Sequence, residues 1–394
     1  MLEYVELVAL FFLQGAALAM WFVPLSNVLD AHGFHAIRPY AFAASALAAF
    51  VSPLIFGAMA DRHASPVKVL RGLSFATAVA MTLVGTAIKS QANPWLVLGL
   101  IQLLAFCSSP TWSISSTIVF ARLADARQEF GPIRAMATLG WMAGACVVSL
   151  LNADTSTLAF YGAGFIWLVV CVFTFFLPQV ETPKSVAALT WSERFGLDAL
   201  TLLKNRDHRV VFIMLVLFSI PLAAFYPYAP VHLRDLSLKH TSAWMALGQV
   251  LEMFAMFGLG ALILKWRLKW IFACGIGFGV ARFALSALDT KSWLLLGVLL
   301  HGASFTLVYI TAQIYLDQRV DPAWRARAQA LMSLMNGGVG NFLGYLATGW
   351  WFSSCSSGIA TKWPLFWGGL SIAVTAVLIY FLVAYRGRAA QAKV

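Results

Sequence analysis

Long apolar stretches recur along almost the whole chain, and they restrict its fold more than any other feature of the sequence. A helix needs roughly 20 consecutive apolar residues to cross a bilayer. The composition agrees with such helices, because 61% of the 394 residues are hydrophobic and only 11% are charged. These values exclude a soluble globular protein and predict an all-α polytopic membrane protein. The twelve predicted transmembrane helices cover residues 5–29, 38–59, 67–87, 94–120, 131–151, 157–178, 209–233, 240–265, 268–288, 291–316, 327–350 and 362–386.

The basic residues are concentrated in alternate connections between these spans. Most of the 27 Lys and Arg residues lie in the even-numbered connections and the C-terminal tail. The positive-inside rule therefore predicts that both termini are cytoplasmic. The same bias accounts for the net charge of +11, so contact with membrane lipid is expected and a nucleic-acid partner is not.

The longest polar stretch, residues 179–208, predicts a cytoplasmic linker between a six-helix half at 1–178 and a second half at 209–394. This division resembles the major facilitator superfamily, whose substrate site lies between the halves near the bilayer midplane. Gly57, Asp61 and Arg62 resemble its GxxxDR loop. The resemblance implies that Asp61 and Arg62 form a cytoplasmic gate, and the alternative is an ordinary charged connection.

Glu252 lies about halfway along the predicted span 240–265, one turn after Gln249. An acid at that depth costs several kcal/mol unless it faces protein or water, so it marks a transport or proton path. The amide and the carboxylate share one helix face and could bind a polar solute. The alternative is a permanent ion pair of Glu252 with Arg282 or Arg134.

A second polar stripe lies on the fifth predicted span. Arg134, Thr138 and Trp141 are spaced i, i+4 and i+7, which places them on one helix face. A guanidinium, a hydroxyl and an indole in this arrangement could bind a polyhydroxylated ring. The same spacing also fits an Arg134 side chain that reaches the cytoplasmic headgroups.

Two later spans carry further candidates. His301 and Phe305 are spaced i and i+4, and a membrane His is a reasonable proton carrier. Tyr226 lies among prolines at the outer end of the seventh span, where bent backbone and aromatic groups predict an outer gate or a platform for a base. An aromatic belt at the interface explains Tyr226 equally well.

The order of several motifs resembles the nucleoside:proton symporter family, which is related to the oligosaccharide:proton and phenylpropionate symporters. The motifs are IRAMATLGW at 133–141, LGQVLE at 247–252, LHG at 300–302, IYLD at 314–317 and RARAQAL at 325–331. The resemblance implies proton-coupled uptake of nucleosides by alternating access. It also implies that the stripe on the fifth span lines the substrate cavity.

The chain departs from this family at three positions near the expected site. Thr306 stands where the family has an acid, and Met136 and Ala137 stand where Trp and Gly are usual. These departures leave Glu252 and His301 as the predicted proton carriers. They also favour an alternative cargo, a sugar or oligosaccharide or an aromatic acid, carried on the same fold.

No metal-ligand cluster, nucleophile with a base, or phosphate-binding loop appears in the sequence. We therefore expect a transporter and not an enzyme, driven by a proton gradient without a cofactor. The expected protein is a monomer in the cytoplasmic (inner) membrane of a bacterium.

Overall fold

The computed structural model describes residues 2–62, 65–122, 126–177, 190, 197–321, 324–357 and 360–387, without the side chains of 2, 3, 52–62, 126–131 and 326. In these ranges the regular structure is entirely helical, apart from an isolated antiparallel bridge between Ser356 and Thr361. The predicted all-α class is confirmed. The predicted linker, 179–208, falls largely outside the described residues.

Nine helical stretches in the described part of the chain are long and apolar enough to cross a membrane. They are Tyr4–Ala31, Pro66–Lys89, Pro94–Phe120, Pro132–Leu150, Arg206–Asp235, Thr241–Lys265, Leu268–Ser286, Lys291–Arg319 and Trp363–Ala384. Each coincides with a predicted span. The three other predicted spans are helical over most of their length, but twelve transmembrane helices and the side on which the termini lie remain predictions.

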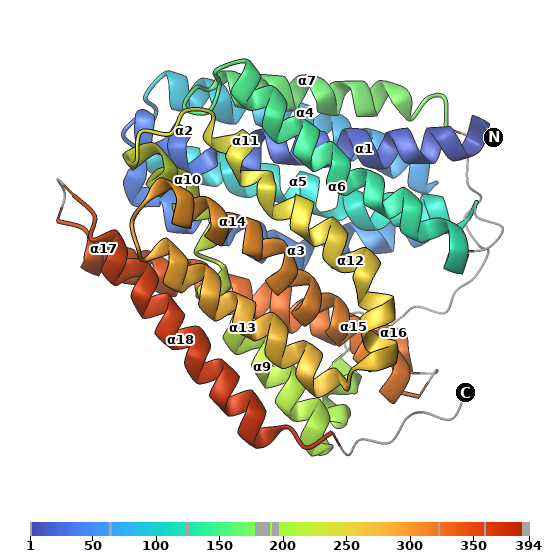
Figure 1. Cartoon of the computed structure of the whole chain (residues 1–394). Helices are drawn as coiled ribbons and strands as arrows, with labels where there is room; N and C mark the ends of the chain where they lie inside the picture. The colour runs from blue at the N-terminus through green and yellow to red at the C-terminus, as the bar shows by residue number, and fades with distance from the viewer. Residues whose placement is uncertain are drawn as a thin grey trace. The chain divides into compact units, whose positions relative to one another are not determined.

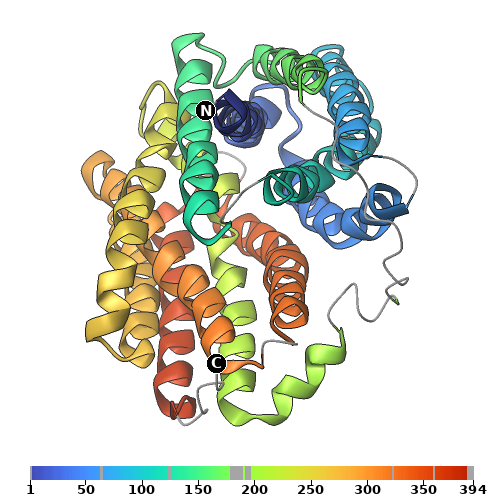
Figure 2. The ribbon, with the colours of Figure 1, turned by 90° about the vertical axis from the view of Figure 1, so that its right-hand side faces the viewer.

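The first of two compact units comprises residues 1–187, 226–234 and 238–246. Its elements are α1 (Leu2–Phe22), α2 (Leu25–Ala31), η1 (His35–Ile37), α3 (Arg38–Arg62), α4 (Pro66–Lys89), α5 (Pro94–Phe120), α6 (Ala126–Leu150), α7 (Leu158–Phe173), most of α10 (Phe225–Asp235) and α11 (Thr241–Met245). Helix α1 packs on α6 and α7, α4 packs on α7 and α5, and α5 packs on α3. Figure 2 views α1 nearly end-on, with α6 and α7 beside it.

Small residues allow α1 and α6 to pack with their backbones in contact. A Cβ added at Gly140 would collide with the backbone of Phe12, and one added at Gly144 would collide with that of Ala16. The GxxxG spacing of Gly140 and Gly144 is typical of close helix pairs in membranes. This contact fixes the rotation of α6, and therefore the direction of its polar stripe.

The second unit comprises residues 188–225, 235–237 and 247–394. Its elements are η2 (Leu197–Lys204), α9 (Arg206–Leu222), α12 (Leu247–Lys265), α13 (Leu268–Ser286), α14 (Lys291–Phe305), η3 (Thr306–Ile310), α15 (Thr311–Arg319), α16 (Arg325–Ser333), η5 (Leu334–Gly340), α17 (Asn341–Cys355) and α18 (Trp363–Ala384). Helix α14 packs on α12 and α13, and α18 packs on α13 and α9. Figure 1 shows α9 in yellow-green and α12 to α18 in yellow to red.

Two stretches of the second unit, η3 and η5, are π-helical. Wide turns of this kind are rare and frequently occur at functional sites. Thr306 begins η3, and η5 carries the glycines of NGGVG. The two π-helical turns therefore mark the part of the unit in which the candidate site is built.

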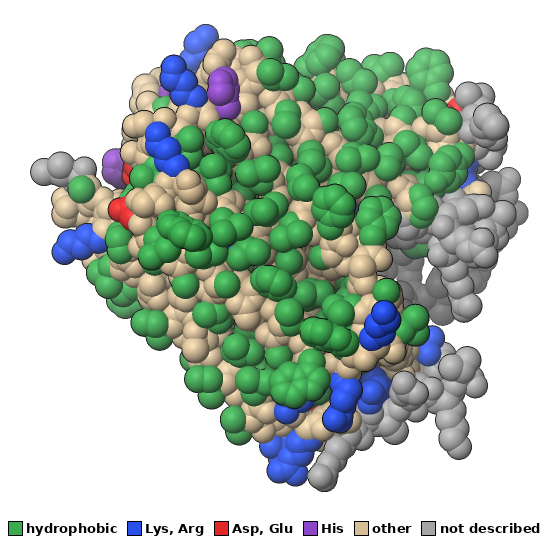
Figure 3. All heavy atoms as spheres, viewed as in Figure 1, with side chains coloured by type: hydrophobic (Ala, Val, Ile, Leu, Met, Phe, Trp, Pro, Cys, Tyr) green, Lys and Arg blue, Asp and Glu red, His purple; other side chains and the backbone are tan. Residues whose placement is uncertain are grey.

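The surface of the protein is largely apolar. Apolar side chains cover the helices in the view of Figure 3, and Lys and Arg side chains gather at helix ends. On α12 and α18, large side chains such as Phe257 at 78% and Val383 at 75% are exposed. Such exposure is expected for helices that face lipid.

Candidate functional site

The polar stripe on α6 is present as the spacing predicts. The side chain of Arg134 is exposed, and those of Thr138 and Trp141 are half-buried. The guanidinium of Arg134 lies 4.1 Å from the centre of the Trp112 ring on α5, a cation–π contact that orients it. Ala137 is buried, with its backbone against Gly15 of α1. The departure from the family at 137 therefore lies in a helix contact beside the stripe.

Three aromatic rings meet at one end of this stripe. Trp141 lies 6.1 Å from Phe22 and 5.8 Å from Tyr226 between ring centroids, and Phe22 lies 5.3 Å from Tyr226. All three contacts are edge-to-face. A cluster of this size and geometry can hold a planar ring of a ligand. Phe22 was not among the predicted site residues, because nothing in an apolar first span distinguishes it from its neighbours.

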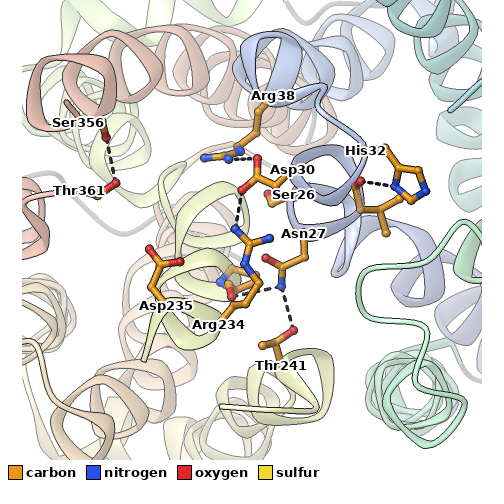
Figure 4. Close-up of polar contacts among 12 residues, drawn as sticks. Ser26, Asn27, Asp30, His32, Arg38, Arg234, Asp235, Thr241, Ser356 and Thr361 are labelled. Carbon is orange, nitrogen blue, oxygen red and sulfur yellow. Dashed lines mark hydrogen bonds and ion pairs between the residues drawn. The ribbon is translucent and has the colours of Figure 1, made fainter. Parts of the chain in front are cut away.

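A buried polar cluster, which we call the outer cluster, lies beyond the rings in the same unit. Asp30 binds both Arg38 and Arg234, and the Arg234 pair measures 2.9 Å. Figure 4 shows Asp30 between the two arginines and Asn27 bonded to Thr241. The cluster therefore joins α2 to α3, α10 and α11.

Asp154 extends the outer cluster to the end of α6. Its carboxylate accepts hydrogen bonds from Ser149 Oγ, from Thr241 Oγ1 and from the backbone N–H of Ser242. An acid on the first N–H groups of a helix is favourable. Helices α10 and α11 follow the predicted linker and so belong to the predicted second half of the sequence. In the structure, however, most of their residues make their contacts within the first unit. The division into halves at 1–178 and 209–394 remains a prediction.

In the second unit, Glu252 lies where α12 and α14 make backbone contact. Its side chain is half-buried. A Cβ at Gly302 of α14 would lie 2.7 Å from Glu252 Cα and would collide with the Gly248 carbonyl. Thr306 is fully buried, and its hydroxyl donates to the Glu252 carbonyl at 3.5 Å. The residue in place of the family acid therefore supports the backbone of Glu252.

His301 lies on α14, one residue before this contact. Its ring is 8% exposed and stacks on Phe225, with centroids 3.9 Å apart. The Nη1 of Arg282 donates a hydrogen bond to His301 Nδ1. Because a guanidinium is only a donor, this nitrogen carries no proton in the structure. Arg282 is 2% exposed and also lies 4.5 Å from the centre of the Phe225 ring.

Phe305 continues the same face toward the π-helical turns. It lies 6.2 Å from His301 and 5.0 Å from Tyr309 between ring centroids. The Tyr309 hydroxyl is 2.8 Å from Ser219 Oγ of α9, and Ser219 also binds Asn336 of η5. A continuous set of aromatic and polar groups therefore runs from α14 to η5.

The structure thus brings the predicted residues into two groups. Arg134, Thr138, Trp141 and Tyr226 lie in the first unit, and Gln249, Glu252, His301 and Phe305 lie in the second. Gln249 is 5% exposed on α12. The side chains of Asp61 and Arg62, the predicted gate, lie outside the described residues. Trp112, Phe225 and Arg282 were not among the predicted site residues.

Apolar helices that carry polar and aromatic groups in their interior are typical of a membrane transporter for a polar solute. The profile of the nucleoside H+ symporter family matches residues 1–390. The chain belongs to this family. It therefore transports nucleosides together with protons, and its relatives are transporters and not enzymes.

Individual relatives agree with this assignment. The chain is 33% identical to the putative nucleoside transporter YegT of Escherichia coli (strain K12), covering 95% of this chain and 91% of that one. It is 24% identical to the nucleoside permease NupG of the same strain, covering 92% and 91%. A crystal structure of NupG, determined for a point mutant, superposes with a TM-score of 0.91 at 23% identity over 98% of this chain and 100% of that one. The fold is therefore that of NupG.

Proposed function

We propose that this chain takes up nucleosides into a bacterial cell by proton symport, with Glu252 as the main proton carrier. The observation that carries the proposal is the position of Glu252, half-buried on an apolar helix where α12 and α14 touch. Ionised, its carboxylate only accepts hydrogen bonds, whereas the protonated form also donates one. A nucleoside that needs this donor binds the protonated form more tightly, and this difference couples the two substrates.

Thr306 supports the choice of Glu252. In the part of the structure described here, the buried Thr306 hydroxyl lies against the Glu252 backbone, and a hydroxyl does not titrate near neutral pH. A role of the family acid in proton coupling would therefore fall to another group in this chain. Glu252, whose carbonyl accepts from Thr306, is the one acid in α12, and α14 and η3 contain none.

His301 has a secondary part in this proposal. Its Nδ1 accepts from Arg282, so a proton can bind there only after the guanidinium moves away. His301 then accepts a proton only in a conformation in which Arg282 has another partner. The stacking of His301 on Phe225, just after the interruption between α9 and α10, would link such a change to the backbone of the seventh span.

For the nucleoside itself, we propose that Arg134, Thr138 and Gln249 bind hydroxyl and base heteroatoms, and that Trp141, Tyr226 and Phe305 contact the base. The support is chemical, because aromatic rings beside a guanidinium and hydroxyl and amide groups match a planar base attached to a polyhydroxylated sugar. The proposal includes twelve spans, cytoplasmic termini, a monomer and transport by alternating access, with Asp61 and Arg62 as the cytoplasmic gate.

The test is uptake of labelled uridine by purified protein in liposomes, with and without an inward proton gradient. Unlabelled uridine, xanthosine, a disaccharide and an aromatic acid serve as competitors, and protein-free liposomes with a protonophore serve as controls. We expect gradient-dependent accumulation that nucleosides inhibit and the other two classes do not. Accumulation that is independent of the gradient, or that only sugars or aromatic acids inhibit, would contradict the proposal.

A further inference from the structure

A hollow in the second unit is lined by none of the residues proposed for transport. It has a volume of about 500 Å³ and forms where α12 ends, α13 begins, and α15 and α18 end. This volume is in the range of sites for small ligands. Four cationic side chains line it: Arg267, Lys269, Arg319 and Arg386. No Asp or Glu is among its described lining residues.

The start of α13 adds to the positive potential of the cavity. Arg267, Leu268 and Lys269 all line it, and α13 begins at Leu268. Arg267 occupies the N-cap position in an extended conformation, and its side chain provides no capping hydrogen bond. The first N–H groups of a helix attract anions, and phosphate in particular. Four cations and a helix start therefore border one cavity.

The cavity is built on packed elements. Lys269 Nζ donates to the Leu382 carbonyl at 2.9 Å, which joins α13 to α18. The N–H of Arg386 donates to the buried carboxylate of Asp207 at 3.0 Å, which joins the chain after α18 to α9. Tyr385, also in the lining, stacks on Phe381 with centroids 4.9 Å apart. The phenol of Tyr385 can donate a hydrogen bond.

Two acids near the cavity, Asp207 and Asp317, bind other groups of the protein. Asp207 is 3% exposed behind the backbone of Arg386. Asp317, on α15, pairs with Arg325 at 3.5 Å and does not line the cavity. The net charge that a ligand meets is therefore strongly positive. An anion is the ligand that these groups favour.

One wall of the cavity is apolar and faces outward. Leu264 is 88% exposed and Trp266 is 50% exposed, and both line the cavity. Trp270, one turn further along α13, is 55% exposed. Tryptophans in this position are typical of the membrane interface. A soluble anion would make no use of this wall, whereas a molecule with a charged head and apolar chains would contact both parts.

We propose that this cavity binds the phosphate group of an anionic phospholipid, with the acyl chains lying beside Leu264 and Trp266. The basic connection between α12 and α13 then has a specific ligand, beyond its predicted effect on topology. The binding chemistry, a phosphate held by arginines, lysine and backbone N–H groups, is shared with free phosphate. Lipid binding is independent of the proposed roles of Glu252 and His301 in transport.

The experiment compares binding of dioleoylphosphatidylglycerol, dioleoylphosphatidylcholine and inorganic phosphate to delipidated, purified full-length protein. Native mass spectrometry measures lipid affinity, and the melting temperature in detergent reports all three ligands. The test variant is Arg267→Gln with Arg386→Gln. The matched control, Lys68→Gln with Lys204→Gln, removes the same charge from two exposed lysines outside the cavity. A third variant, Arg267→Lys with Arg386→Lys, keeps the charge.

We expect wild type to bind phosphatidylglycerol in preference to phosphatidylcholine, and the Gln variant to bind it about 30-fold more weakly, as for two cations removed from an anionic membrane surface. The control and the Lys variant should bind within about threefold of wild type. Equal loss in the test and control variants, or no loss in either, would overturn the proposal. Protection by inorganic phosphate alone, without preference for phosphatidylglycerol, would overturn the lipid assignment and give the site to a soluble phosphate.

Discussion

Replacing Gly302 by Ala adds a methyl group directly against the backbone of Glu252 and should displace it. The added Cβ would lie 2.7 Å from Glu252 Cα and closer still to the Gly248 carbonyl and the Glu252 N–H. These are backbone atoms, so no side-chain rotation relieves the overlap. Carbon atoms in good contact lie about 3.5–4.0 Å apart, and α12 and α14 must therefore separate by about 1 Å. Overpacking of this kind destabilises proteins by about 1–3 kcal/mol, against a gain of about 1 kcal/mol in helix propensity.

Gly258→Ala is the matched control, because it adds the same methyl group to α12 at a position where a Cβ meets nothing within 4 Å. Melting temperature in detergent and gradient-driven uridine accumulation in liposomes are measured for both variants. We expect Gly302→Ala to melt at a lower temperature and to accumulate about tenfold less uridine, since a displacement of about 1 Å strongly impairs a functional group. Gly258→Ala should melt at or above the wild-type temperature and transport normally. If the two variants behave alike, the α12–α14 contact does not position Glu252.

Two further predictions concern the first unit. Asp30→Asn removes the charge that Arg38 and Arg234 share, so we expect a loss of about 3 kcal/mol in the free energy of unfolding, measured by melting temperature, whereas Asp317→Asn in an exposed pair should cost less than about 1 kcal/mol. Similar melting temperatures for the two variants would refute a structural role for the outer cluster. Arg134→Gln should weaken nucleoside binding about tenfold, the loss of one charge-assisted hydrogen bond. It should change the free energy of unfolding by less than about 1 kcal/mol, because the side chain is exposed and its cation–π contact with Trp112 is of that size. Unchanged affinity by calorimetry would remove Arg134 from the site.

The fold class followed from the sequence because a bilayer imposes length and apolar composition on each helix. All predicted spans fall on helices, and the prolines near Tyr226 lie beside the interruption between α9 and α10. What the apolar pattern could not supply was helix rotation, because lipid-facing and buried faces are both apolar and leave no periodic signal.

The candidate site could be predicted where polar residues share one helix, as Arg134, Thr138 and Trp141 do. It could not be predicted where the partners come from different helices. Arg282 and His301 are 19 positions apart, and only the packing of α13 on α14 brings them together. Thr306 shows the same limit, because its sequence position suggested a missing proton carrier and only the structure shows its contact with the Glu252 backbone.

Gradient-driven accumulation by Glu252→Gln, compared with Thr306→Val, tests the central claim most directly. Both variants are reconstituted in liposomes, and uridine counterflow without a gradient is measured beside accumulation with an inward proton gradient. We predict that Glu252→Gln retains counterflow, because an amide still donates and accepts hydrogen bonds, but loses accumulation because it cannot titrate. Thr306→Val should retain both activities. Accumulation by Glu252→Gln at the wild-type level would contradict the claim that Glu252 couples protons to nucleoside transport.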